Sequence, residues 1–178
     1  FESVPSCEPL EGLADRLPAA ALNTGAPADD APAAPRPGPV LVELGLPKSS
    51  AGGPVQFLFQ GDFGPQHGLE ELIRAWARVD PRRAVLILRG ADSSFKARCT
   101  ALADKLGLLQ KSVFFPAAAA EGELLAVATE ADVGIVPYRP DNINRRLSCP
   151  SELSQYMLAR LAVLSDDLDY VKTLIDQY

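Results

Sequence analysis

The sequence is poor in the residue types that mark several common classes of protein. Its 178 residues contain three scattered cysteines (Cys7, Cys99 and Cys149) and one histidine. A zinc site needs four closely spaced ligands and a disulfide scaffold needs a denser, even set of cysteines, so neither is expected. Three reduced thiols are typical of a cytoplasmic protein. Basic residues are also few: 17 lysines and arginines against 23 acidic residues give a net charge of −6, which argues against nucleic-acid binding.

Long apolar runs are missing as well. No stretch approaches the roughly 18 apolar residues that indicate a membrane span. The chain does not open with the charged and then apolar segments of a signal peptide. Peripheral contact with a membrane stays open. Because the first residue is Phe1 and not methionine, we expect a piece of a longer protein.

Composition changes near residue 55. Proline and alanine are dense before this point, above all over residues 26–39. Proline fixes φ and removes a backbone donor, so residues 1–54 are expected to form a Pro/Ala-rich connecting segment, partly extended or disordered. Its short apolar pieces, 10–17 and 40–46, could dock on a neighbouring surface. Residues 55–178 are expected to form the domain, and a truncation at its C-terminus stays open.

After residue 55, short apolar runs alternate with segments of helical spacing. Strands are expected at 55–59, 84–88, 111–115, 133–136 and 161–164, and helices at 69–79, 94–106, 121–130, 151–160 and 167–176. Continuous apolar strands are typical of a parallel sheet that is covered on both faces. We therefore predict an α/β domain with a Rossmann-like parallel β-sheet and helices on both faces. Trp76 and Met157 are expected in its core, and Asp166, Asp167 and Asp169 are expected to cap the last helix.

Ligands of such sheets bind beyond the carboxyl ends of the strands. The first strand is followed by a glycine-rich turn, 61–68, whose backbone N–H groups could cradle a phosphate. Its spacing is not that of the dinucleotide fingerprint, so a dehydrogenase is not expected. The third strand ends at Phe115 and Pro116 with no aspartate to phosphorylate, which excludes a response regulator.

The fourth strand is followed by a long polar loop over residues 138–150. Arg145 and Arg146 lie in this loop, before a helix whose N-cap is expected at Ser151. Guanidinium groups near a helix N-terminus favour a diphosphate. The alternative for both arginines is a solvated loop.

Three segments in this order resemble the C-terminal, donor-binding half of a GT-B glycosyltransferase, close to glycosyltransferase family 4. They are 59–61 with 67–75, then 131–138, and finally 148–157 with 162–165. The resemblance covers about residues 55 to 175. It implies a nucleotide-sugar donor, retention of the anomeric configuration and no metal ion. It also implies an N-terminal GT-B domain, missing from this chain, that would supply most of the acceptor site.

The resemblance assigns roles to individual residues. His67 stands where the family has a phosphate-binding Lys or Arg, and Gln155 stands where a Glu accepts hydrogen bonds from the ribose. Glu152 replaces a frequent Lys and would repel a diphosphate. The candidates for the donor phosphates are thus Gly61, His67, Arg145 and Arg146, and those for the ribose or base are Gln155, Arg89 and Tyr138. Neither a catalytic residue nor a metal ligand is assigned.

Two functions remain open from the sequence. The first is a cytoplasmic glycosyltransferase of carbohydrate biosynthesis, with this chain as its donor-binding half, which alone should bind the donor poorly and turn over nothing. The second is a degenerate, non-catalytic module that keeps the fold for contacts with proteins. The altered residues at the ligand positions favour the second, and a titration with nucleotide-sugars distinguishes the two.

Overall fold

The computed structural model describes residues 44–177. Most of the expected connecting segment, including its apolar piece 10–17, and Cys7 therefore lie outside the described residues. In the part that is described, Leu44 and Leu46 pack against the apolar cluster beneath one face of the sheet. The docking expected for the second apolar piece is confirmed for these two side chains.

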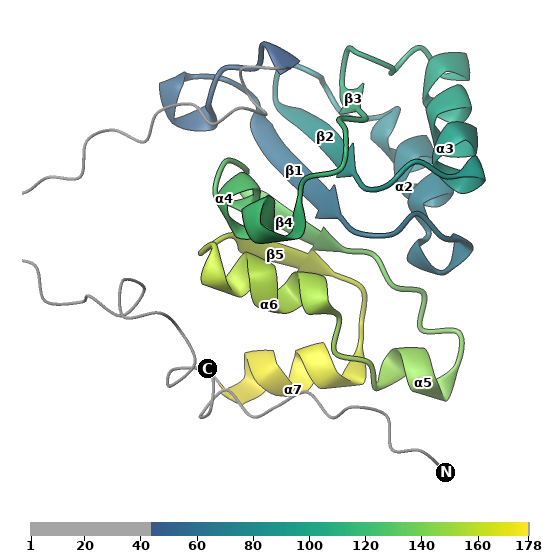
Figure 1. Ribbon diagram of the computed structural model, residues 1–178, viewed down its shortest axis with the longest axis vertical. Coiled ribbons are helices and arrows are strands. Elements are labelled where there is room, and N and C mark those ends of the chain that lie inside the picture. Colours follow the sequence, from purple (N-terminus) through teal and green to yellow (C-terminus); the bar gives the residue numbers. More distant parts are fainter. Residues whose placement is uncertain (1–43, 178) are drawn as a thin grey trace, which may run out of the picture. The chain divides into compact units, whose positions relative to one another are not determined.

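The predicted fold class is confirmed. Five strands form one parallel sheet in the order β3-β2-β1-β4-β5 (Figure 1): β1 (Val55–Gln60), β2 (Ala84–Arg89), β3 (Val113–Phe114), β4 (Val133–Val136) and β5 (Ala162–Ser165). The helices between and after them are α2 (Leu69–Trp76), α3 (Ser94–Lys105), α4 (Leu124–Ala128), α5 (Ile143–Arg146), α6 (Ser151–Leu158) and α7 (Asp169–Gln177). Short 3-10 helices occupy η4 (Ser49–Ala51), η5 (Pro65–His67) and η6 (Glu121–Glu123).

Successive side chains of the central strands point to opposite faces, and helices cover each face. On one face, Phe59 of β1 and Leu86 of β2 pack against α2 and α3, where Trp76 and Cys99 are buried. On the other face, Leu58 and its neighbours pack against α4, α6 and α7. The burial of Trp76 is confirmed. None of the described helices is long and apolar enough to cross a bilayer.

The strand β5 is not buried on both faces. Val163 and Leu164 are 36% and 51% exposed, because β5 lies at the edge of the sheet and pairs only with β4 among the described strands. The expectation that Met157 lies in the core is wrong for a related reason. It is 43% exposed on α6, on the side toward this edge, where it lines an apolar hollow with residues of β5 and α7.

Other differences concern short elements. The loop expected after β4 contains α5, which Asn142 caps by accepting a hydrogen bond from the backbone of Arg145. The N-cap of α6 is Pro150 and not Ser151, and its side chain makes no cap hydrogen bond. The helix expected over 121–130 is a 3-10 turn followed by the five residues of α4. The last helix begins at Asp169, so only this aspartate of the three lies in its first turn.

The order of the strands reverses direction at β1. The chain moves outward from β1 through β2 to β3, then returns to the other side of β1 with β4 and moves outward again to β5. The connections that leave β1 and β4 therefore diverge on opposite faces of the sheet. A crevice opens beyond the carboxyl ends of strands at such a point, and ligands of open α/β sheets bind there.

Candidate functional site

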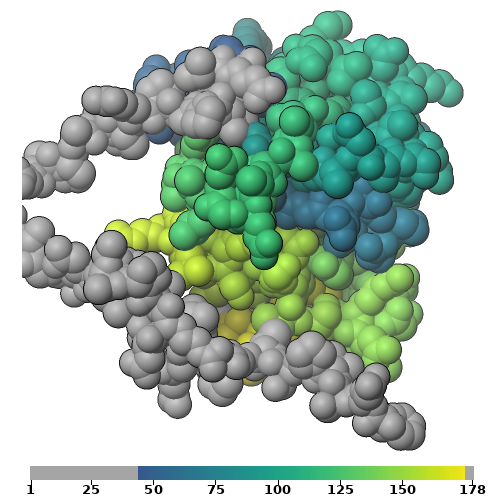
Figure 2. Space-filling view, in the orientation of Figure 1, coloured from purple at the N-terminus to yellow at the C-terminus, as the bar shows by residue number. Residues whose placement is uncertain are grey.

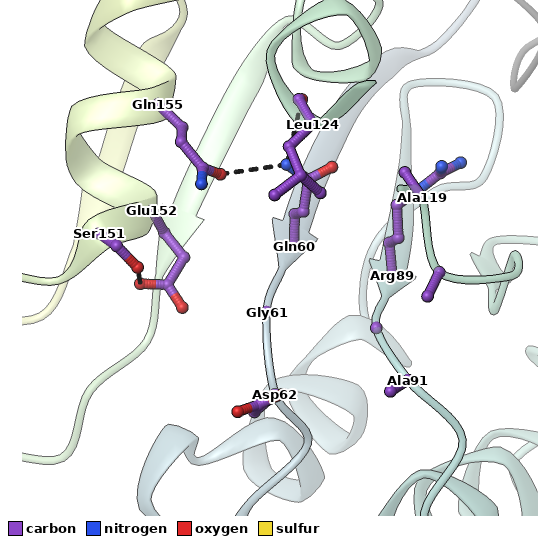
Figure 3. Close-up of a pocket in the computed structure, with 12 residues that line it drawn as sticks. Gln60, Gly61, Asp62, Arg89, Ala91, Ala119, Leu124, Ser151, Glu152 and Gln155 are labelled. Atoms are coloured by element: carbon purple, nitrogen blue, oxygen red, sulfur yellow. Dashed lines mark hydrogen bonds between the residues drawn. The ribbon is translucent and has the colours of Figure 1, made fainter. Parts of the chain in front are cut away.

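A pocket of about 340 Å³ lies at this carboxyl edge. We call it the edge pocket (Figure 3). Its walls come from the ends of β1 and β2, from the loop after β3 and from the first turns of α4 and α6. It is lined by Gln60, Gly61, Asp62, Arg89, Gly90, Ala91, Ala118, Ala119, Leu124, Ser151, Glu152 and Gln155.

Two glycines bring the ends of β1 and β2 together at the floor of the pocket. The backbone N–H of Gly61 donates a hydrogen bond to the carbonyl of Arg89 at 3.0 Å. A Cβ atom on Gly90 would overlap the carbonyl oxygen of Gly61 and the ring of Phe63. Glycine at position 90 therefore lets the two strand ends approach this closely.

Gln60 is the centre of a polar network on the β1 wall. Its backbone N–H donates to the phenol oxygen of Tyr156 at 2.9 Å, and its side-chain amide donates to the carbonyl of Leu124 and to Oε1 of Gln155, both at 3.1 Å. Figure 3 shows the hydrogen bond that joins the side chains of Gln60 and Gln155. Oε1 of Gln155 thus keeps one lone pair for a ligand hydroxyl, and its amide nitrogen offers donors.

The carbonyl oxygen of the Gln60 side chain has no hydrogen-bond partner among the described residues, although Gln60 is 3% exposed. An unpartnered buried acceptor is unfavourable, because it has lost its water without gaining a protein partner. A ligand hydroxyl or amine in the pocket would satisfy it.

Two carboxylates give the pocket a negative side. Asp62 is exposed on the turn after β1, whereas Glu152 is 7% exposed in the first turn of α6. Burial raises the pKa of Glu152, and the nearby charge of Asp62 raises this pKa further. Arg89, at the end of β2, stands on the opposite wall (Figure 3). It is 4% exposed, so it is a buried residue of the pocket wall.

His67 and Tyr138 lie elsewhere on the carboxyl edge. Their rings pack edge to face with centroids 4.5 Å apart, and His67 also contacts Phe59. His67 is 2% exposed and lines a separate hollow of about 460 Å³ between α2, the end of β4 and the residues after β5. Burial lowers the pKa of His67 to about 4, so its ring is neutral at pH 7 and carries no charge toward a phosphate.

Arg145 and Arg146 do not line the edge pocket. Arg145 donates to Oδ1 of Asp141 at 2.6 Å, and Arg146 pairs with Asp169 of α7 at 3.0 Å. The structure therefore brings Gly61, Arg89 and Gln155 together and leaves His67, Tyr138 and the two arginines outside this group. A phosphate-binding role for His67, Arg145 and Arg146 stays a prediction.

Neither a metal cluster nor the hollow beside β5 provides a second polar site among the described residues. Among residues 44–177, no three His, Cys, Asp or Glu side chains gather closely enough to hold a metal ion. The larger hollow between α6, β5 and α7, of about 690 Å³, is lined mainly by apolar side chains.

Among the pocket residues to which the sequence analysis assigned no role are Gln60 and Gly90. The signal for Gln60 was a polar residue at the end of an apolar run, which marks a buried side chain that needs partners. The signal for Gly90 was its place directly after a strand, level with Gly61 in the parallel register of β1 and β2.

Comparison with known proteins finds likeness in structure only. No protein-family model and no curated protein matches the chain. Solved structures share its fold, and two of them are glycosyltransferases. One is WaaG, a glycosyltransferase involved in lipopolysaccharide biosynthesis (TM-score 0.54, 20% identity, 76% of this chain and 34% of that one). The other is the C-terminal domain of LpcC, a glycosyl transferase group 1 family protein from Francisella tularensis (TM-score 0.53, 15% identity, 76% of this chain and 67% of that one).

The chain has the fold of a C-terminal glycosyltransferase domain of the GT-B type, which confirms the resemblance at the level of fold. It spans about a third of the WaaG chain. Membership of family 4 and a retaining mechanism stay predictions.

Proposed function

We propose that this chain is the donor-binding domain of a glycosyltransferase that moves a sugar from a nucleotide-sugar to an acceptor. The observation that carries the proposal is the position of the edge pocket. It lies beyond the carboxyl end of β1, at the point where the strand order reverses, with the first turn of α6 on its rim. Nucleotides bind α/β sheets at this point because free N–H groups and open backbone converge there.

The residues of the pocket suit a nucleoside diphosphate in part. Gln155 is the proposed ribose ligand, through the free lone pair of its Oε1 and the N–H groups of its amide. Gly61 and Gly90 line the pocket without side chains that would fill it, and Arg89 provides a buried cation at the end of β2. Glu152 opposes the phosphates, so we expect weak binding.

The proposed reaction needs a second domain. The chain spans only part of the WaaG structure, and in a two-domain transferase the acceptor site comes from the other half. We therefore expect this chain alone to bind the donor without turnover. The reaction is proposed to need no metal ion and to retain the anomeric configuration, both on the strength of the resemblance.

The test is a thermal-shift titration with UDP-, GDP- and ADP-sugars. A ligand that binds the folded state raises stability by RT ln(1 + [L]/Kd), so a millimolar ligand reveals even a weak site. Gln155→Ala should abolish the shift, whereas Ser154→Ala, one position away on the exposed face of α6, should preserve it. A protein that no nucleotide-sugar stabilises would instead match the non-catalytic module.

A further inference from the structure

We infer that the carboxylate of Glu152 occupies the anion position at the N-terminus of α6, and that a diphosphate enters the edge pocket only when this carboxylate is neutral or displaced. The carboxylate of Glu152 thus competes with external anions for this position and sets the selectivity of the pocket for anions. The inference rests on the proposed function only for the identity of the natural ligand.

The placement of the side chain carries the inference. Glu152 is the second residue of α6, lines the edge pocket and is 7% exposed. Its Oε1 lies against the backbone of Gly61, where an added Cβ would stand 2.5 Å from it. The carboxylate is therefore held between the turn after β1 and the start of α6, where the two walls of the pocket meet.

The hydrogen bonds of this carboxylate are those that an external anion would use. Its Oε2 accepts a hydrogen bond from the hydroxyl of Ser151 at 3.3 Å, and the carboxylate also accepts one from the backbone N–H of Glu152. Pro150, the N-cap, supplies no side-chain acceptor for the first turn. Glu152 fills this role with a negative charge, which the helix dipole favours.

A second observation points independently to a ligand in the same pocket. The side-chain carbonyl oxygen of Gln60 is buried there and accepts no hydrogen bond from a described residue. The pocket therefore holds an unsatisfied acceptor on one wall and an anion position already filled from within on the other. A nucleotide with hydroxyl groups and phosphates would satisfy the first and compete for the second.

The charges around Glu152 favour its neutral form. Asp62, in the turn after β1, faces it with a charge of the same sign. The hydroxyls of Tyr138, after β4, and Tyr156, on α6, lie close enough that its charge raises their pKa values. Arg89 lies across the pocket on β2. Burial and Asp62 together raise the pKa of Glu152, so it takes up a proton at milder acidity than a free glutamate does.

The test measures pyrophosphate binding to the whole chain by calorimetry at pH 8 and at pH 5.5. Glu152→Gln keeps the shape of the side chain and removes its charge. At pH 8 this variant should bind pyrophosphate at least about tenfold more tightly than the wild type, the change that one pKa unit of interaction produces. At pH 5.5 the difference should shrink, because the raised pKa of the wild-type carboxyl makes it lose its charge at milder acidity than a free glutamate does. Glu123→Gln, which removes an exposed charge beside the pocket residue Leu124, is the matched control and should bind like the wild type.

Equal affinity of wild type and Glu152→Gln at pH 8, or no pyrophosphate binding by either, would overturn the inference. The same titration with UDP, GDP and ADP and with the uncharged nucleosides separates it from the proposed function. If Glu152→Gln gains pyrophosphate affinity but no nucleotide binds more tightly than pyrophosphate, the anion position is real and the proposed function is wrong. If nucleosides and nucleotides bind and Glu152→Gln changes neither, the proposed function stands and the inference is wrong.

Discussion

The phenol oxygen of Tyr156 accepts a hydrogen bond from the backbone N–H of Gln60 at 2.9 Å, across 96 positions of sequence. This bond connects the end of β1, on one wall of the edge pocket, to α6, which forms another wall. Tyr156 is fully buried, and its ring covers Gly134 of β4 so closely that a Cβ there would overlap it. The spacing of the two walls therefore depends on contacts beneath the pocket as well as on the hydrogen bond between Gln60 and Gln155 within it.

Tyr156→Phe should lower the stability of the domain. The substitution leaves the buried N–H of Gln60 without this partner, and an unsatisfied buried donor costs about 1–3 kcal/mol. Each kcal/mol corresponds to a fall of about 2–4 °C in Tm for a domain of this size. Tyr138→Phe, which keeps the ring that packs on His67, is the control in the same thermal melt. Equal melting of wild type and Tyr156→Phe would contradict the role of this bond.

Gly134→Ala should lower the stability of the domain more than the addition of a single methyl group suggests. The added methyl group would meet the ring of Tyr156, which has no free space to move into because it is fully buried. Overpacking of this kind costs about 1–3 kcal/mol. Gly122→Ala is the matched control, since a Cβ at Gly122 meets no atom within 4 Å. Chemical denaturation of both variants measures the difference, and an unchanged Gly134→Ala midpoint would be inconsistent with this packing.

His67 should make the domain less stable in acid. Its pKa is lowered to about 4 by burial, from an ordinary value of 6.5, so the unfolded chain binds a proton more readily than the folded one. Stability should therefore fall as the pH decreases from 6.5 toward 4. His67→Phe keeps an aromatic ring beside Phe59 and Tyr138 and should flatten this part of the profile of stability against pH. An identical profile for wild type and variant would exclude His67 as the cause.

Glu152 should change the stability of the domain with pH in the opposite direction to His67. Its pKa is raised in the folded state, so the stability that it contributes is present in acid and is lost as the pH rises through that pKa. Glu152→Gln should therefore have a higher Tm than the wild type at pH 8, and the difference should narrow as the pH falls. Melting curves at pH 8 and pH 5 measure it. A lower Tm for Glu152→Gln than for the wild type at pH 8 would contradict this prediction. It would mean that the negative charge of Glu152 stabilises the folded domain.

Substitutions of Arg145 and Arg146 test the phosphate-binding role that the sequence predicts for them. Each is paired with an aspartate, and neither lines the edge pocket. If the phosphates bind in the edge pocket alone, the double variant Arg145→Ala with Arg146→Ala should bind UDP, GDP and ADP within about twofold of the wild type, because exposed ion pairs have small energies. A loss of about tenfold or more by calorimetry would restore both arginines as phosphate ligands.

The sequence was sufficient for the sheet, because the continuous apolar runs that form β1, β2 and β4 are buried on both faces. The sequence was insufficient where the burial of a side chain depends on which elements lie next to it in space. Met157 has the spacing of a core residue but lies toward the open edge at β5. The four-residue helix α5 shows no apolar periodicity, and only Asn142, as its N-cap, marks it in the sequence.

The same reasoning explains the candidate site. Gly61 and Gln155 come together as expected, since both follow from the topology of a parallel sheet. The pairing of Arg145 with Asp141 and the burial of Glu152 depend on side-chain orientation, which spacing does not determine.

The most direct test of the account is to map where a nucleotide binds. Backbone amide shifts of the isotope-labelled chain, and of Glu152→Gln to offset weak binding, can be followed by NMR during titration with UDP, GDP and ADP. The account predicts that the shifts concentrate at Gly61, Gly90, Ser151 and the side-chain amide of Gln155. Shifts that gather at β5 and α7, or that appear at no residue with any of the three nucleotides, would contradict it.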